Sequence, residues 1–445
     1  MTSDVQTWEG VVDVLGMPGP VYLHLADDGD PSATYDVPAI GAMAMPVEDL
    51  EVTVDALRGR LLRSPFVLQR TADGYAGSID TPDGQRALDL RLEHPDVRHY
   101  TVPLQAPVTY CPPESLDDGW PLAKAVDVGL DLDRVAALSR AIAAGELPRV
   151  DDVVMARNGK LVVDDYYYGR TPATLHTFQS CTKSITALVV GCLVDRGLIG
   201  SLDEQVWPLF IDRSELRWVA QRYDVTVRQL LTMSAHLVWN EEVHYTDPSN
   251  DNTRMNASGD LIGYVLSRAL QDHRDPKLFE YQSGLTILLG EVIRRVVGRA
   301  VDDVAAEMLF GPLGITDFRW LSNPDGTKHT GGGLCLRPRD MAKIGQMMLD
   351  GGRWQGHQVL SAEWIAQATS VQTAAPGVNC GFSWFLGEVE ADDRKLRYFN
   401  ASGYGGQYLF GFPDLQLVVV VNAHDFYGDG SIGPILKNFV LPAVS

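Results

Sequence analysis

The stretch Ser180-Cys181-Thr182-Lys183 decides how this chain is interpreted, because it sets a hydroxyl and an amine three residues apart. Apolar residues recur at helical spacing between residues 185 and 193, and Gly197 ends the run, so we expect a helix that begins near Ser180. Residues three apart share one face of a helix, which brings the Ser180 hydroxyl within reach of the Lys183 amine. A serine hydroxyl is a poor nucleophile near neutral pH unless a base takes its proton, and a buried lysine can be that base.

The same four residues also fit an ordinary structural role. A serine that caps an exposed helix, followed by a solvated lysine, gives an identical pattern, and a chain of 445 residues could contain it by chance. The stretch alone therefore leaves a catalytic and a structural interpretation open, and the rest of the chain has to decide between them.

A second motif, Phe279-Glu280-Tyr281-Gln282-Ser283-Gly284, precedes another apolar helix that we expect over residues 285–297. The Tyr281 phenol could share the proton of Ser180 and pass it to a leaving group. Ser283 adds a hydroxyl on the same short loop. A buried aromatic residue before a helix is the plain alternative.

The third motif, Ser402-Gly403-Tyr404-Gly405-Gly406-Gln407, leads into a strand expected over residues 407–412. Glycines let a backbone approach a ligand closely, and the backbone amides there can point at a developing oxyanion. By itself this segment also fits an ordinary loop.

In this order and at these separations, the three motifs resemble those of the serine β-lactamase and penicillin-binding superfamily, in its class C-related branch. That branch includes esterases, D-aminopeptidases and 6-aminohexanoate-dimer hydrolases. The resemblance covers residues 129–445 and implies a β-lactamase-like α/β/α domain with an antiparallel sheet and a helical insertion. It makes Ser180 the nucleophile, Lys183 its base and Tyr281 the proton-relay partner. It also implies an oxyanion hole formed by the backbone amides of Ser180 and Gln407.

Two residues depart from the pattern of this superfamily. Tyr404 stands where lactamases carry lysine and carboxypeptidases often carry histidine. The missing cation argues against penicillins and D-Ala-D-Ala ends as substrates, unless a cation such as Arg254 replaces the charge. His236 stands where glycine is usual, and it either lines the pocket or fills a gap at the surface. The predicted substrate-binding residues are Ser283, Tyr404, Gly405, Gly406, His236 and Trp239.

Composition narrows the class of partner. The formal net charge of -21, from 37 basic and 58 acidic residues, argues against nucleic acids and anionic membranes. Five cysteines, an odd number without close pairs, indicate reduced thiols in a cytoplasmic protein, and the N-terminus lacks the pattern of a signal peptide. The sequence contains neither a His-Glu-x-x-His nor a Cys-x-x-Cys motif, so no metal or organic cofactor is implied. A small molecule is the expected partner, and homo-oligomer formation stays open.

The chain divides into three predicted parts. Residues 1–106 alternate in polarity between turn signals and predict a β-rich N-terminal domain, residues 107–128 are a linker rich in proline and aspartate, and residues 129–445 form the hydrolase domain. Within that domain we expect a hairpin around Asn158-Gly159 and strands near 382–386, 407–412 and 416–422. Strands at both ends with helices between them indicate one antiparallel sheet and a helical insertion.

These observations favour a serine hydrolase that cleaves a carboxylic ester or a small amide through an acyl-enzyme on Ser180. One alternative is an acyltransferase, in which an amine or alcohol replaces water. Another alternative, from a different class, is a non-catalytic binding protein that keeps the fold.

Overall fold

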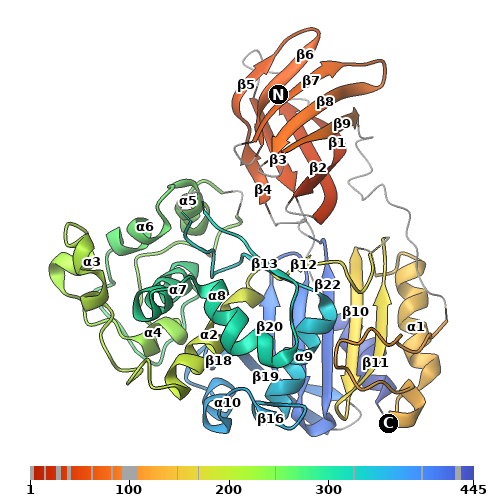
Figure 1. Ribbon diagram of the computed structural model, residues 1–445, viewed down its shortest axis with the longest axis vertical. Coiled ribbons are helices and arrows are strands. Elements are labelled where there is room, and N and C mark those ends of the chain that lie inside the picture. The colour runs from red at the N-terminus through yellow and green to blue at the C-terminus, as the bar shows by residue number, and fades with distance from the viewer. Residues whose placement is uncertain are drawn as a thin grey trace. The chain divides into compact units, whose positions relative to one another are not determined.

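The computed structural model describes residues 5–14, 17–26, 32–37, 42–61, 64–81, 84–92, 109–147, 149–168, 170–245, 247–323, 326–391, 394–425 and 432–444. The chain separates into two compact units, Met1–Pro103 and Leu104–Ser445 (Figure 1). The predicted boundary between residues 106 and 107 lies outside the described residues.

The first unit is a nine-stranded antiparallel sheet with the order β4-β3-β2-β1-β9-β8-β7-β6-β5, which confirms a β-rich N-terminal region. Two meanders meet where β1 pairs with β9, for example at Trp8 and Leu92. One face carries the apolar core, which includes Trp8, Leu23 and Leu68. The strands are β1 Val5–Val14, β2 Met17–Ala26, β3 Ser32–Val37, β4 Ala42–Pro46, β5 Glu48–Val52, β6 Ala56–Leu61, β7 Ser64–Arg70, β8 Gly74–Thr81 and β9 Gly84–Leu92.

The second unit is built on an eight-stranded antiparallel sheet with the order β11-β10-β22-β21-β20-β19-β18-β17. The early hairpin joins the late strands where Val153 pairs with Val421, so both ends of the domain form one sheet, as the sequence predicts. Asn158 and Gly159 turn the hairpin with φ values of 51° and 74°, which suits a tight two-residue turn. The strands are β10 Val150–Arg157, β11 Lys160–Tyr166, β17 Thr373–Ala375, β18 Val378–Cys380, β19 Phe385–Ala391, β20 Arg394–Gly403, β21 Gln407–Phe412 and β22 Leu417–Ala423.

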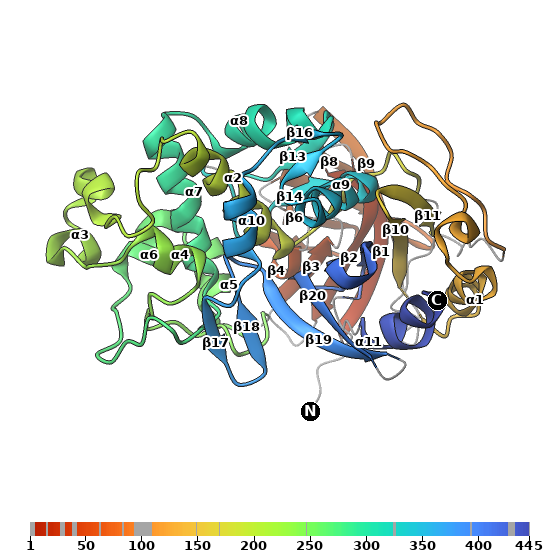
Figure 2. The same cartoon turned by 90° about the horizontal axis from the view of Figure 1, so that it is seen from below.

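Helices cover both faces of this sheet, which makes three layers. Successive side chains of a strand point to opposite faces. Val154 and Val420 belong to the core that includes helices α2 (Cys181–Asp195) and α9 (Pro338–Leu349), and α7 (Ser283–Val297) packs against α2. Val153 and Val421 pack with α1 (Leu132–Ala143) and with the C-terminal segment that begins with α11 (Gly433–Ile435). Figure 2 shows α9 on one side of the strands and α11, near α1, on the other.

The helical insertion lies between α2 and the late strands. Its helices and those nearby are α3 Arg217–Gln221, α4 Val227–Leu231, α5 Asp251–Ala257, α6 Leu261–Ser267, α8 Val301–Ala305 and α10 Ala362–Ala368. Short strands are β12 His176–Thr177, β13 Phe318–Trp320, β14 Leu334–Leu336, β15 Arg353–Trp354 and β16 His357–Gln358. Turns of 3-10 or π geometry occupy Ala125–Val128, Trp207–Arg213, Ala306–Phe310, Gly311–Leu313, Pro413–Leu415, Leu436–Val440 and Leu441–Ala443.

Residues 109–128, most of the segment predicted as a linker, pack within the second unit. The Tyr110 hydroxyl donates to the Val162 carbonyl at 3.0 Å. Trp120 is buried, and its indole N–H donates to the Arg339 carbonyl at 3.1 Å. These contacts attach the segment to β11 and to α9.

A buried carboxyl group on β10 makes the stability of the second unit depend on pH. Asp152 is fully buried, and its Oδ1 accepts a hydrogen bond from Asn422 Nδ2 at 2.6 Å. Burial raises the pKa of Asp152 well above its usual value, and the nearby Asp151 and Asp164 charges act in the same direction, against the Asn422 hydrogen bond. Because the folded-state pKa exceeds the unfolded-state pKa, the stabilising contribution of this group is full at low pH and is lost as the pH rises through the folded-state pKa.

We therefore expect Asp152→Asn to raise the thermal midpoint by a few degrees at pH 8 and to change it little at pH 4. The amide keeps an oxygen for Asn422 Nδ2, and it cannot ionise. Melting curves followed by circular dichroism at both pH values measure this. Asp414→Asn is the control, because the Arg397 hydrogen bond lowers the pKa of that exposed carboxyl. A lower midpoint for Asp152→Asn at pH 8 would contradict the argument.

Candidate active site

A strained residue precedes Ser180 and fixes the start of α2. Gln179 has a φ of 44°, in the left-handed region that non-glycine residues rarely adopt. Its side-chain amide donates to Thr177 Oγ1 at 2.9 Å, and Thr177 in β12 pairs with Cys335 in β14. Strand, turn and helix therefore meet in one rigid junction, with Ser180 at the first turn of α2.

The structure brings Ser180, Lys183 and Tyr281 together. Lys183 Nζ lies 3.0 Å from Ser180 Oγ, and the Tyr281 hydroxyl lies 2.8 Å from the same oxygen. Lys183 Nζ also donates to the Gly331 carbonyl and lies 5.1 Å from the centroid of the Tyr281 ring. The side chain of Ser180 caps none of the described amides of α2, and Lys183 is only 3% exposed. Neither residue has the surroundings of a serine cap followed by a solvated lysine.

The surroundings of Lys183 supply no counter-charge. In the part of the chain that the structure describes, no carboxylate forms an ion pair with Lys183, whereas buried Lys343 lies 2.8 Å from Asp340. Desolvation lowers the pKa of the neighbouring His329 to about 4, and the Lys183 charge acts in the same direction, so this imidazole is neutral at pH 7. Burial raises the pKa of the Cys181 thiol, which leaves it protonated beside the more reactive pair.

The loop that carries Tyr281 is held by the segment after α4. The Glu280 amide donates to the Met233 carbonyl at 3.0 Å. The Gln282 side chain both accepts from the Leu237 amide and donates to the Leu237 carbonyl, each at 3.0 Å. The residues on both sides of Tyr281 are thus fixed, which orients the phenol toward Ser180.

Glu241 organises two of the predicted substrate-binding residues. Its carboxylate accepts from the Ser283 amide at 2.8 Å, from Ser283 Oγ at 2.6 Å and from Trp239 Nε1 at 2.8 Å. A carboxylate is well placed there, at the N-terminus of α7, where the Gln282 side chain makes no capping bond with the described residues. Ser283 and Trp239 are therefore bound to Glu241 and are not among the described residues that line the void beside Ser180. Glu241 carries no signal as a site residue in the sequence, because no local pattern links it to a residue 42 positions away.

A small void adjoins Ser180. Its volume is about 10 Å³, room for roughly one water molecule. The walls include Phe279 and Phe385, whose rings meet edge to face with centroids 6.0 Å apart. The lining residues are Ser180, Lys183, Ser184, Met233, Phe279, Tyr281, Cys380, Ser383, Phe385 and Ser402. Phe279 belongs to a motif visible in the sequence, but Cys380 and Phe385 come from β18 and β19 and carry no local signal.

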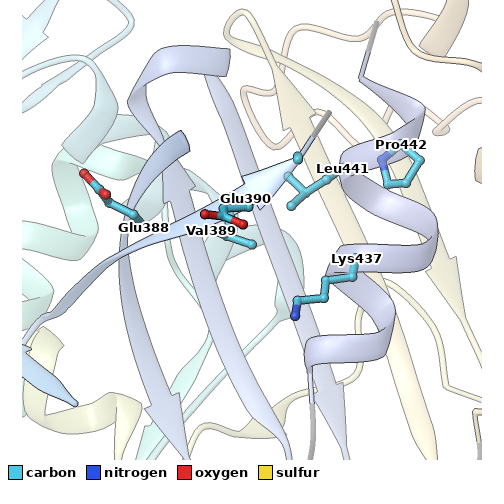
Figure 3. Close-up of a pocket in the computed structure, with 7 residues that line it drawn as sticks. Glu388, Val389, Glu390, Lys437, Leu441 and Pro442 are labelled. Atoms are coloured by element: carbon cyan, nitrogen blue, oxygen red, sulfur yellow. The ribbon is translucent and has the colours of Figure 1, made fainter. Parts of the chain in front are cut away.

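A larger cavity of about 490 Å³ lies elsewhere, between β19 and the C-terminal helical segment (Figure 3). Its lining consists of Glu388, Val389, Glu390, Ala391, Lys437, Leu441 and Pro442. Figure 3 shows Glu390 and Lys437 on facing elements. Carboxylates and an ammonium group without a nucleophile offer no acyl chemistry, so size alone does not make this cavity the active site.

The glycine-rich segment packs against the start of α2. A side chain at Gly403 would bring its Cβ within 2.5 Å of the Phe178 carbonyl, and one at Gly406 would come within 2.9 Å of Ala423 Cβ. Gly405 and Gly406 turn the chain with φ values of 80° and 93°. The Gln407 carbonyl accepts from Cys181 Sγ at 3.5 Å, so the Gln407 backbone lies beside the residue that follows Ser180.

Tyr404 contacts the helical insertion. Its hydroxyl lies 3.2 Å from His244 Nε2, and its ring meets Tyr245 edge to face with centroids 4.9 Å apart. Arg254, the candidate replacement for the missing cation, donates instead to the Pro248 carbonyl at 2.7 Å. Neither Tyr404 nor Arg254 is among the described residues lining the void.

His236 takes neither of the two positions expected from the sequence. It is buried, 1% exposed, and lies at neither the surface nor the void among the described residues. Its Nδ1 is 3.1 Å from Glu280 Oε2, and its Nε2 is 2.7 Å from the Asp275 carbonyl. His236 therefore belongs to the packing behind Tyr281.

No three His, Cys, Asp or Glu residues among the described residues are grouped so as to hold a metal ion. None of the helices in the described part of the chain combines the length and the apolar character needed to cross a membrane.

Known proteins match this chain in sequence and in fold. A family model described as Beta-lactamase matches residues 148–437, more than half of the chain. The 6-aminohexanoate-dimer hydrolase of Paenarthrobacter ureafaciens is 28% identical over 226 residues, which cover 48% of this chain and only 56% of that protein. Two solved structures share the fold. EstCE1, a hydrolase with promiscuous acyltransferase activity, is 16% identical, with a TM-score of 0.55 over 70% of this chain and 97% of its own chain. A family VIII carboxylesterase is 19% identical, with a TM-score of 0.50 over 66% of this chain and 93% of its own chain. The chain belongs to the Beta-lactamase family.

Proposed function

We propose that this protein is a serine hydrolase that cleaves a carboxylic ester or a small amide through an acyl-enzyme on Ser180. The observation that carries the proposal is the position of Ser180 Oγ, 3.0 Å from Lys183 Nζ and 2.8 Å from the Tyr281 hydroxyl. A hydroxyl between a phenol and an amine that has no ion-pair partner among the described residues is a nucleophile with two proton-transfer partners.

The reaction follows from these contacts. Ser180 Oγ attacks the acyl carbon while its proton passes to the Lys183 amine, and the carbonyl oxygen becomes an oxyanion. Backbone amides of Ser180 and Gln407 stabilise that charge, a contribution of about 3–4 kcal/mol per donor in hydrolases. Lys183 and Tyr281 then deliver the proton to the departing alcohol or amine as its bond to the acyl carbon breaks. Water attacks the resulting ester of Ser180 and releases the acid.

The direct test is to trap the covalent intermediate. A fluorophosphonate should add one label per chain, and peptide mass spectrometry should find it on Ser180. Assays on simple esters and short ω-amino amides, the latter suggested by the name of the curated relative, then identify the acyl class. Added alcohols or amines distinguish hydrolysis from acyl transfer by the product formed. A label on Cys181 or Ser402, with Ser180→Ala still active, would refute the proposal.

The third motif leads to a prediction about substrate charge. Tyr404 occupies the position at which relatives that bind carboxylates carry a cation, and the described residues lining the void include no lysine or arginine besides Lys183, which acts as the base in the proposed reaction. A charge-assisted hydrogen bond to a substrate carboxylate is worth roughly 1.5–3 kcal/mol, or about 10–150-fold in rate. We therefore expect kcat/KM for p-nitrophenyl butyrate to exceed that for nitrocefin by at least about tenfold.

Variants at the same position show whether charge is the cause. Tyr404→Lys should narrow the difference between the two substrates, whereas Tyr404→Phe, which also loses the bond to His244, should leave it in place. Both substrates are measured on one preparation of each variant. A wild-type preference for nitrocefin would contradict the prediction.

A further inference from the structure

The backbone of His236 adopts a conformation that favours glycine. Its φ is 57°, and its side chain is only 1% exposed. Histidine is tolerated in the left-handed region more readily than bulky or β-branched residues are, yet glycine would be unstrained there. A strained and buried side chain in a position suited to glycine persists only where its contacts compensate for the strain.

Both nitrogens of the His236 ring face acceptors. Nε2 lies 2.7 Å from the Asp275 main-chain carbonyl, which can only accept a hydrogen bond. Nδ1 lies 3.1 Å from Glu280 Oε2, within ion-pair distance. A neutral imidazole has one N–H and cannot donate twice. The contact with Glu280, whose side chain is 29% exposed, is an ion pair when His236 is an imidazolium and Glu280 a carboxylate.

This pair is attached directly to the Tyr281 loop. Glu280 precedes Tyr281, and its Oε2 also accepts from Gln271 Nε2 at 2.8 Å and from Gln282 Nε2 at 3.2 Å. The Tyr281 hydroxyl reaches Ser180 Oγ at 2.8 Å. Because Tyr281 lies in a loop rather than within a helix or strand, the position of its phenol depends on the bonds made by its two neighbours.

We propose that His236 is a positioning residue for Tyr281, acting through its ion pair with Glu280. The proposal rests on the proposed function, in which Tyr281 moves the proton of the leaving group. His236 touches no reacting atom. It fixes Glu280, and Glu280 fixes the start of the loop that aims the phenol at Ser180. Loss of the pair should slow the chemical step and leave substrate binding unchanged.

A double-mutant cycle between His236 and Tyr281 tests this dependence. His236→Gly suits the left-handed backbone and removes the ion pair, and we expect it to lower kcat roughly tenfold with KM changed by less than about twofold, because small displacements of a catalytic group are costly. In a Tyr281→Phe background the same substitution should change kcat by less than about twofold, because the group that His236 positions is already gone. A structural role unrelated to Tyr281 would instead give the same loss in both backgrounds.

A matched control and a second variant complete the design. Arg222→Gly is the matched control, because it also replaces a residue with a φ of 51° by glycine, at the end of α3. The kcat of this variant should equal that of the wild type. Glu280→Ala removes the other half of the ion pair and should reproduce the His236→Gly loss, with no further loss in the double variant. Circular dichroism shows whether His236→Gly folds. If that variant does not fold, Glu280→Ala provides the test in its place.

The outcomes separate this inference from the function on which it rests. Two outcomes would overturn the positioning role even if Ser180→Ala is inactive. One is an equal loss of kcat on His236→Gly in the wild-type and in the Tyr281→Phe background. The other is a wild-type kcat in both His236→Gly and Glu280→Ala. Activity that survives Ser180→Ala would overturn the proposed function itself. Non-additive losses, together with an inactive Ser180→Ala, support both.

Discussion

Ser180→Ala should lower kcat by about 10⁵–10⁶-fold, the size of the loss when the nucleophile of a serine hydrolase is removed. The substitution takes away the oxygen that Lys183 and Tyr281 both contact. Lys183 keeps its bond to the Gly331 carbonyl, so the buried amine is not left without a partner. The variant should therefore fold normally and melt within a few degrees of the wild type. Burst kinetics and fluorophosphonate labelling of both proteins measure the loss.

A second serine at the start of a helix provides the matched control. Ser361 precedes α10, and its Oγ accepts from the Trp364 amide at 3.1 Å, as an ordinary cap does. Ser361→Ala should lower the free energy of unfolding by about 1 kcal/mol and leave kcat unchanged. The two variants thus separate a cap from a nucleophile. Ser180→Ala with activity above about 1% of the wild type, well above the residual expected of a lost nucleophile, would show that another residue attacks the substrate.

Local patterns account for the part of the site that the sequence predicts. Ser180 and Lys183 lie on one helix, so their spacing alone brings them together. Asn158 and Gly159 both have positive φ, which is the geometry that this pair of residues favours in a hairpin. Strand-like runs at both ends of the domain, with helices between them, predict the shared antiparallel sheet.

What the sequence does not predict depends on contacts between distant segments. Glu241 meets Ser283 across 42 positions, and His236 meets Glu280 across the same kind of separation, so neither pair leaves a periodic signal. Backbone strain is equally hidden. A strand expected over residues 382–386 begins only at Phe385, because Ser383 has a φ of 57°, which no strand accommodates.

The geometry also explains why the departure at His236 was difficult to interpret. A histidine in place of glycine suggests a pocket or surface position when only its neighbours in the sequence are known. The side chain instead turns inward, where the Asp275 carbonyl bonds Nε2 and the Glu280 carboxylate lies 3.1 Å from Nδ1. Tertiary contacts decide whether a substituted residue contacts the substrate or positions a catalytic group. The boundary predicted between the N-terminal domain and the linker stays a prediction, since residues 93–108 lie outside the described residues.

Lys183→Ala is expected to lower kcat by about 10⁴-fold, because the proton of Ser180 then has no adjacent base. Tyr281→Phe should cost less, about 10²-fold, since it removes a phenol but leaves the amine 3.0 Å from Ser180 Oγ. Turnover of p-nitrophenyl butyrate at saturating substrate compares the three proteins. Both variants should keep wild-type circular dichroism, because no described carboxylate depends on Lys183 for its charge.

Chemical rescue distinguishes the loss of a base from the loss of packing. Lys183 is only 3% exposed, so its removal leaves a cavity next to Ser180 that a small primary amine can enter. Added methylamine should restore part of the kcat of Lys183→Ala, with a rate that rises with the concentration of the neutral amine, and should not affect Ser180→Ala. Lys183→Arg retains a cation but cannot act as a base near neutral pH, so it should be as slow as Lys183→Ala. An Arg variant with wild-type turnover would show that Lys183 provides charge rather than proton transfer, and fast turnover by Lys183→Ala would place the base on another residue.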